Sequence, residues 1–206
     1  MGGISPSEEI VVKALDRSQA DYARAIRGHV ASLWRGKINL FTFVDRMIFS
    51  IDRGYRRAWI QGAGACGVKA SDLTMSDLAE IRNMSGRDYL FVARFGAAIV
   101  EKPRSEGFKL GPHYTRTELW VNRYIAVRNR ARISSCGEKA LIWLFSPLKE
   151  HCTDCAFLHK KVYTAIEWQE IDIVPQSHKL ECEGWRCGCG VFVTNKPITT
   201  GTRPVF

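Results

Sequence analysis

Apolar residues recur at spacings of three and four along the first two thirds of the chain, and this pattern predicts long amphipathic helices. Ser5-Pro6-Ser7-Glu8 is typical of a helix start, with Ser5 as the cap and Pro6 at the first helical position. The apolar stripe of this first helix comprises Val11, Ala14, Leu15, Tyr22, Ala25, Ile26, His29, Val30 and Leu33. Within that stripe, His29 is interpreted as a core histidine. Gly36 and Lys37 are predicted to end the helix.

A second helix is predicted after Asn39, whose side chain can cap it. Its buried face comprises Leu40, Phe43, Val44, Met47, Ile48, Ile51, Tyr55, Ala58 and Trp59. The helix runs into Gly62-Ala63-Gly64-Ala65-Cys66-Gly67, which matches the GxGxxG pattern literally. A dinucleotide site needs that pattern between a strand and a helix. Because it follows an amphipathic helix here, we interpret it as a flexible connection between helices.

Two further helices are predicted before residue 146. Thr74-Met75-Ser76-Asp77 resembles a capping box, and the helix it starts is predicted to run from Met75 to about Lys102, where Pro103 stops it. Thr115-Arg116-Thr117-Glu118 is predicted to start a fourth helix, which runs to about Phe145 and ends at Ser146-Pro147.

The character of the chain changes after Pro147, where cysteines, turns and the short β-type runs 161–163 and 191–193 replace the helical pattern. We therefore predict a mainly α fold. It consists of a long-helix body over residues 1–145 and a small C-terminal α+β module, resembling a zinc knuckle, over residues 146–206.

The C-terminal module contains five of the seven cysteines: Cys152, Cys155, Cys182, Cys187 and Cys189. Two residues between Cys152 and Cys155 let both thiolates reach one ion, and Zn²⁺ takes four ligands in a tetrahedron. A module of about sixty residues buries little surface, so a structural metal is a common remedy. The sequence therefore predicts a structural Zn²⁺ site.

The five cysteines are one more than the four ligands that the ion needs. Our preferred set is Cys152, Cys155, Cys182 and Cys187. Cys189 is left out of it because a single residue separates it from Cys187, and two thiols with this spacing rarely both suit one tetrahedron. Cys189 is the alternative fourth ligand, and His151 and His178 are lesser candidates. Asp154, between the paired cysteines, is predicted to accept backbone hydrogen bonds.

The alternatives to metal binding are buried reduced thiols, or disulfides formed after release from the cell. Cys66 and Cys136 stand alone in the sequence and are interpreted as core residues. A four-thiolate site is closed, whereas a catalytic zinc keeps an open position. We also find no Ser/His/Asp set, no phosphate loop and no HNH-type pair of histidines with Asn. The sequence therefore predicts a protein without enzymatic activity.

The 206 residues carry a formal net charge of +9, which favours polyanionic partners such as nucleic acid, or forms a solvated basic surface. Five arginines of the predicted fourth helix are the candidate contacts to nucleic acid or a partner protein. Arg116, Arg123 and Arg130 flank its apolar face on one side, and Arg128 and Arg132 flank it on the other. They could contact phosphate, or pair with acidic groups of other helices or of a partner.

No segment has the roughly 18 apolar residues that span a bilayer, and the N-terminus does not resemble a signal peptide. We therefore expect a soluble protein made in the cytoplasm, with no membrane partner.

The segment from His151 to Tyr163, with Trp168, Pro175 and Gly184-Trp185-Arg186-Cys187-Gly188-Cys189, resembles the C-terminal module of phage head morphogenesis proteins of the Mu F type. That family has a CxxC, an L-x-G-K-V run and a closing C-R-C element. Here Leu158 to Val162 matches the run, with Lys160 in place of Gly. Arg186 precedes the Cys-x-Cys, and the usual His-Pro is missing, with Cys182 as the candidate substitute for the histidine. These departures leave the ligand set open.

Upstream, Leu33-Trp34-Arg35-Gly36-Lys37-Ile38 and Trp120-Val121-Asn122-Arg123-Tyr124 also look like prophage proteins of this group. The resemblance implies a minor head protein of the virion, made in the host cytoplasm and part of a large assembly. Its body would dock on the portal or the major capsid protein, with packaged double-stranded DNA as a further candidate partner. It would assist head assembly, DNA packaging or ejection. The alternatives are a zinc-containing nucleic-acid-binding regulator and a metal-dependent hydrolase or nuclease.

Overall fold

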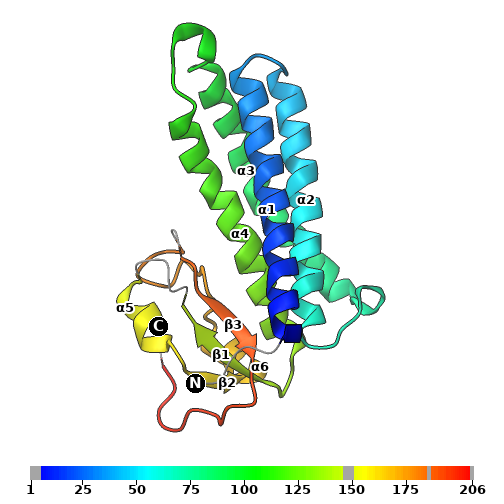
Figure 1. The fold of residues 1–206 in the computed structure, drawn as a ribbon, viewed down its shortest axis with the longest axis vertical. Helices are drawn as coiled ribbons and strands as arrows, with labels where there is room; N and C mark the ends of the chain where they lie inside the picture. The colour runs from blue at the N-terminus through cyan, green and yellow to red at the C-terminus, as the bar shows by residue number, and fades with distance from the viewer. Residues whose placement is uncertain (1–5, 146–150, 185–186, 205–206) are drawn as a thin grey trace. The chain divides into compact units, whose positions relative to one another are not determined.

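A computed structural model describes residues 6–145, 151–184 and 187–204, with the side chains of the first helix described from residue 17 onward. Four long helices come first: α1 (Pro6–Trp34), α2 (Leu40–Gly64), α3 (Met75–Val100) and α4 (Gly111–Ser135). Short elements follow: β1 (Ala140–Leu144), α5 (Thr153–Leu158), β2 (Val162–Thr164), α6 (Ala165–Ile171) and β3 (Gly190–Val193). The predicted mainly α fold with a small C-terminal α+β part is confirmed (Figure 1).

Local hydrogen bonds explain where two of the long helices begin. The side chain of Asn39 accepts a hydrogen bond from the backbone N–H of Thr42, 2.8 Å away, which confirms the predicted cap of α2. Thr74 and Asp77 exchange the reciprocal bonds of a capping box at the start of α3. The predicted cap at Ser5 lies outside the described residues.

The chain divides into two compact units, residues 1–54 with 85–121 and residues 55–84 with 122–206. In the first unit, the buried Phe95 lies 6.2 Å from Phe43 and 5.2 Å from Trp120, measured between ring centroids. His29 is half-buried in this unit and its Nε2 lies 2.9 Å from the Ser50 hydroxyl. The predicted boundary near residue 146 adjoins residues outside the described part and stays a prediction.

In the second unit, β1 is the central strand of a three-stranded antiparallel sheet of order β2-β1-β3, as Figure 1 shows. Ile142 of β1 pairs with Val162 on one side and Phe192 on the other. The predicted β-type runs at 161–163 and 191–193 therefore match β2 and β3. The buried Trp168 of α6 donates a hydrogen bond to the Leu141 carbonyl, which fixes this helix to the sheet.

The predicted extent of the fourth helix was wrong at its C-terminal end. Helix α4 ends at Ser135, Gly137 adopts a left-handed conformation with φ of 54°, and residues 140–144 form β1. The apolar run of β1 is buried on both faces because it is a central strand. Such a run has no period-two alternation, so it cannot be told from the end of an apolar helix by pattern alone.

The glycine stretch 62–67 begins inside α2, which ends at Gly64, and its first glycine has a packing role. A Cβ on Gly62 would lie 2.2 Å from the Arg128 carbonyl oxygen and 2.7 Å from the Ala131 Cβ. Glycine at this position therefore lets α2 approach α4 closely within the second unit. A Cβ on Gly64, by contrast, would meet no atom of the described residues within 4 Å.

Candidate metal centre

The Cys152-x-x-Cys155 pair lies at the start of the short helix α5. Cys152 is its N-cap residue, and the Cys152 Sγ accepts a hydrogen bond from the backbone N–H of Cys155 at 3.4 Å. The chain therefore presents both sulfurs of the pair from one turn of helix.

Reciprocal hydrogen bonds attach this turn to the segment that carries Cys182. The Asp154 carboxylate accepts the backbone N–H of Glu181 at 2.7 Å, which confirms the predicted role of Asp154. The Glu181 carboxylate in turn accepts the backbone N–H of Thr153 at 2.8 Å and its hydroxyl at 2.6 Å. These bonds bring Cys152 and Cys182 together although they are 30 residues apart in the sequence.

A buried amide pair holds the Cys187-x-Cys189 segment. The side-chain amide of Gln176 donates to the carbonyls of Cys187, at 3.1 Å, and of Cys189, at 2.7 Å. Its oxygen accepts a hydrogen bond from Asn129 of α4, and Asn129 also accepts the Val191 N–H. Neither amide is predicted from the sequence, because isolated Asn and Gln residues have no pattern that marks them as buried.

Gly184 is also required by this packing. It has a φ of 75°, and a Cβ there would lie 2.3 Å from the Gln176 carbonyl oxygen. A left-handed glycine is therefore needed where the chain at Gly184 approaches the backbone of Gln176.

The five cysteine sulfurs converge in two overlapping groups. In one group the sulfurs of Cys152, Cys155 and Cys182 all lie within 4.8 Å of one another. The same limit holds for the sulfurs of Cys155, Cys187 and Cys189 in the other group. Cys155, Cys187 and Cys189 are buried, whereas Cys152 and Cys182 are half-buried.

The spacing fits a metal–thiolate centre. The Sγ atoms of Cys155 and Cys187 lie 3.8 Å apart. With Zn–S bonds of about 2.3 Å, two sulfurs of a tetrahedral zinc site are separated by about 3.8 Å. The preferred sequence set and the alternative ligand Cys189 all belong to this cluster, which could hold a metal ion through thiolates.

The crowded thiols shift one another's proton affinities. Hydrogen bonds to Cys187 and then Cys189, with burial, raise the pKa of Cys155. The hydrogen bond from Cys155, followed by that from Cys189, lowers the pKa of Cys187. Burial is the main cause that raises the pKa of Cys182 to about 12, against the effect of the Gly184 N–H. A bound cation would reverse the raised values, because sulfur binds metals as thiolate.

The histidines considered as lesser ligands are not members of these sulfur groups. The ring of His151 stacks on Phe145 with centroids 4.0 Å apart, and His159 stacks on the same ring at 3.7 Å. His178 is exposed. Among the described residues, the grouped metal-ligating side chains are all cysteines, a donor set suited to Zn²⁺ and other soft ions.

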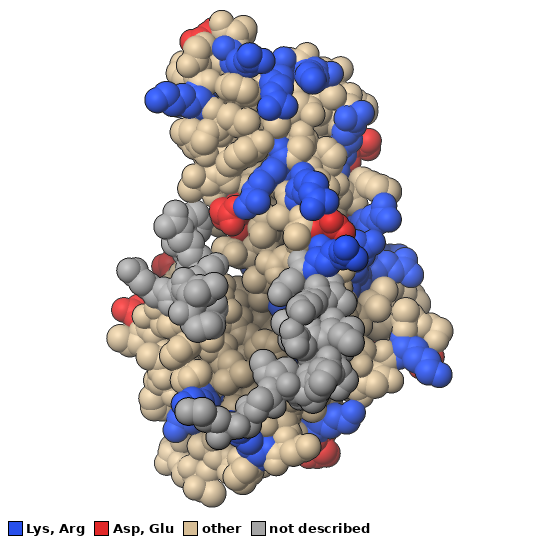
Figure 2. Space-filling view, viewed as in Figure 1, with Lys and Arg blue, Asp and Glu red and all other residues tan. Residues whose placement is uncertain are grey.

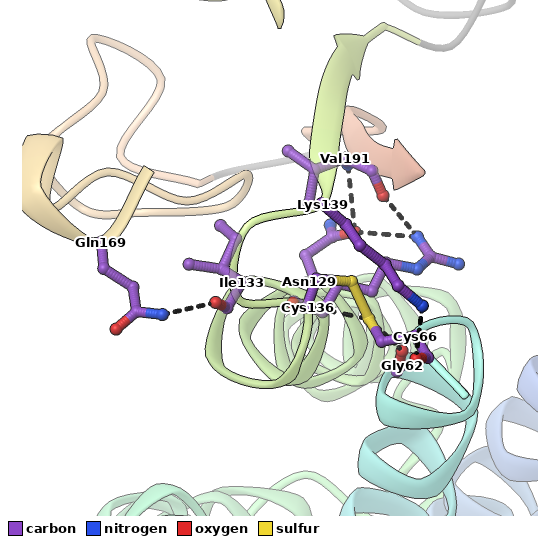
Figure 3. The surroundings of a disulfide bond; sticks show 9 residues. Gly62, Cys66, Asn129, Ile133, Cys136, Lys139, Gln169 and Val191 are labelled. Atoms are coloured by element: carbon purple, nitrogen blue, oxygen red, sulfur yellow. Dashed lines mark hydrogen bonds between the residues drawn. A yellow bond between two sulfur atoms is a disulfide. The ribbon is translucent and has the colours of Figure 1, made fainter. Parts of the chain in front are cut away.

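Cys66 and Cys136 do not stand alone, as the sequence had suggested, but form a disulfide (Figure 3). Both are buried, as expected of core residues, with Cα atoms 5.0 Å apart. The bond joins the turn after α2 to the end of α4, and Lys139 donates a hydrogen bond to the Cys66 carbonyl beside it. Sequence spacing could not reveal this pair because 70 positions separate the two residues.

The five candidate contact arginines lie in different environments. Arg128 and Arg132 are 8% and 2% exposed, so they are not part of an accessible contact surface. Arg132 donates to the Val191 carbonyl at 2.7 Å, and burial is the main cause that lowers its pKa to about 9. These two arginines were expected beside an apolar face, but they lie within the packed interior of the second unit.

The other three arginines are more accessible. Arg116 and Arg123 are exposed, and Arg130 is half-buried with an ion pair to Glu80 at 3.5 Å. The guanidinium of Arg116 lies 4.9 Å from the centroid of the Phe95 ring. Figure 2 shows Lys and Arg side chains spread over the face in view, with fewer Asp and Glu side chains among them.

Comparison with known proteins gives no relatives: no family model, curated protein or solved structure matches this chain. Within the described part of the chain, no helix is both long enough and apolar enough to cross a membrane.

Proposed function

We propose that this chain is a non-enzymatic structural protein whose C-terminal module is closed by one Zn²⁺ ion, and that it serves as a minor head protein of a tailed phage. The observation that supports the proposal is the convergence of five cysteine sulfurs from segments up to 37 residues apart. Four thiolates complete the tetrahedral coordination of Zn²⁺. The ion would therefore be a structural link between α5 and the Cys182–Cys189 segment.

A structural role suits the surroundings of the sulfurs. Three of the five cysteines are buried, and the segments that carry them are fixed by Asp154, Glu181 and Gln176. A catalytic zinc needs an open coordination position and a nearby acid or base. A closed set of thiolates supplies neither, so the chemistry of the donor set favours stability over turnover.

The phage-head role follows from the resemblance of the cysteine block, residues 151–189, to the C-terminal module of Mu F-type head morphogenesis proteins. The partners proposed are the portal and the major capsid protein. In the virion the protein would be a minor component of the head, and the net charge of +9 suits a position close to packaged DNA.

Co-assembly tests this role. The full chain is produced together with the portal and major capsid proteins of the phage that encodes it, and purified heads are analysed by quantitative mass spectrometry. We expect a few copies per head, and capture of the portal by the tagged chain. Heads that assemble normally without any of this protein would contradict the proposal.

A zinc-containing nucleic-acid-binding protein is the second candidate, favoured by the net charge and the exposed Arg116 and Arg123. Fluorescence anisotropy with duplexes of different sequence, at two salt concentrations, distinguishes the roles. Phosphate contact alone gives weak, sequence-independent binding that falls steeply with salt. Tight binding with base preference would favour a regulator, and cleavage lost on chelation would favour a nuclease.

A further inference from the structure

The arrangement of the five sulfurs offers more than one zinc ion can use. One tetrahedral ion takes four thiolates and leaves a fifth over. The described sulfurs instead form two groups of three, which share Cys155 and together include all five cysteines. Two groups of three with one common member are the ligand arrangement of two metal ions bridged by a single sulfur.

An N–H donor lies beside a sulfur of the first group. The backbone N–H of Cys155 donates a hydrogen bond to the Cys152 Sγ at 3.4 Å. Hydrogen bonds to sulfur are a usual part of the surroundings of metal–thiolate centres.

Trp143 adds a donor to the buried group. Its indole N–H is buried and has no hydrogen-bond acceptor among the described residues, and Trp143 belongs to the same buried cluster as Cys189. Cys189 is itself buried and belongs to the second sulfur group, so it is a candidate ligand and not only a spare thiol.

Cys155 has the position that a bridging thiolate needs. It belongs to both groups, is 1% exposed, and its sulfur lies 3.8 Å from that of Cys187. A thiolate sulfur has lone pairs for two metal ions. The burial of Cys155, Cys187 and Cys189 also excludes water, which protects an easily oxidised ion.

The number of ligands in each group selects the metal. Two zinc ions in three-thiolate groups would each lack a fourth ligand, whereas Cu(I) is a soft ion that three thiolates can satisfy. We propose that the cluster has a second binding mode, in which two Cu(I) ions occupy the groups Cys152–Cys155–Cys182 and Cys155–Cys187–Cys189 with Cys155 as the bridge. This inference rests on the metal-binding part of the proposed function but not on the phage role.

The test compares how many Zn²⁺ ions and how many Cu(I) ions one chain binds. The full chain is used as the Cys66→Ser/Cys136→Ser variant, so that no thiol outside the cluster contributes. The reduced protein is titrated with Zn²⁺ and, in a separate experiment, with Cu(I), both in the absence of oxygen. The Cu(I) titration contains a Cu(I) chelator that removes weakly held ions, and bound metal is counted by native mass spectrometry. We expect about one zinc but about two copper ions per chain. The Cys189→Ser variant should lose about half of the copper.

Copper K-edge X-ray absorption gives a second readout that does not depend on a variant. A bridged pair produces a copper–copper contribution, and separate ions do not. One copper ion per chain at saturation, or two without that contribution, would overturn the inference while leaving the zinc site intact. If neither metal binds the folded chain, the proposed zinc module fails as well.

Discussion

Asp154 and Glu181 hold the two halves of the cysteine module together, because the carboxylate of Asp154 accepts the backbone N–H of Glu181 at 2.7 Å. The carboxylate of Glu181 completes the exchange by accepting both donors of Thr153. Each of these three residues is directly next to a cysteine of the cluster in the sequence. The spacing of the sulfurs of Cys152 and Cys182 therefore depends on side chains that do not bind metal.

Replacement of Asp154 by Ala should weaken zinc binding without removing a ligand. Loss of a group that orients metal ligands typically costs about 10- to 100-fold in affinity. Competition with a zinc chelator measures the change. Glu138→Ala is the matched control, because Glu138 is an exposed acidic residue outside the module's cysteine segments. Equal zinc affinities for the two variants would show that the Asp154–Glu181 bond does not position the sulfurs.

Gly62→Ala should destabilise the protein, because the added methyl would lie 2.2 Å from the Arg128 carbonyl oxygen. Overpacking of this kind costs about 1–3 kcal/mol of the free energy of unfolding. Chemical denaturation measures it. Gly64→Ala, two residues further along α2, meets nothing within 4 Å and should be neutral or slightly stabilising. Similar stabilities for the two variants would contradict the close approach of α2 and α4.

Removal of the Cys66–Cys136 disulfide should lower stability only under oxidising conditions. The bond closes a loop of 70 residues, for which chain entropy gives a contribution of about 4 kcal/mol. The Cys66→Ser/Cys136→Ser variant is compared with the wild type by thermal unfolding, with and without reductant. The two proteins should differ without reductant and approach each other with it. An unchanged melting temperature in both conditions would mean that the disulfide does not form.

The acid sensitivity of the module should depend on Glu167. The backbone N–H of Thr164, with smaller help from the Thr164 hydroxyl and Arg203, holds the pKa of Glu167 below its ordinary value of 4.5. A lowered pKa in the folded state means that the carboxylate stabilises the fold above about pH 4.5, and this contribution is lost as the pH falls through the lower folded value.

Glu167→Gln isolates this charge, since Gln can still complete the capping box. We expect the wild type to be more stable by less than about 1 kcal/mol at neutral pH, because the side chain is partly exposed. The difference should shrink below pH 4.5 in denaturation curves. Glu138→Gln provides the baseline for loss of an exposed carboxylate. A difference between Glu167→Gln and wild type that does not change with pH would refute the assigned charge effect.

The sequence predicted the long helices well because their signals are local. Asn39 and the Thr74–Asp77 pair cap helices within four residues of themselves, and apolar spacing marks the buried faces. The strand at residues 140–144 was missed because its apolar run has no alternation that distinguishes it from the end of an apolar helix. Its pairing with β2 and β3, which come later in the chain, makes it a strand.

In the candidate site too, features set by neighbouring residues were predicted, whereas features set by residues far away in the sequence were not. The Cys-x-x-Cys pair was correctly placed because both cysteines belong to one short turn of helix. Asp154 was correctly predicted to accept a backbone N–H, but its partner Glu181, 27 residues away, could not be named from the sequence. The burial of Arg132 and the roles of Asn129 and Gln176 could not be predicted, since each depends on the carbonyls of the Cys187–Val191 segment. Polar residues of this kind are identified only once the packed partners are known.

X-ray absorption at the zinc edge tests the central claim most directly, because it reports the atoms bound to the metal. The chain is purified under reducing conditions without added metal, and its zinc content and coordination shell are measured together. We expect about one zinc per chain, surrounded by four sulfurs at about 2.3 Å. A folded chain without metal, or a shell made mainly of nitrogen and oxygen, would contradict the zinc module.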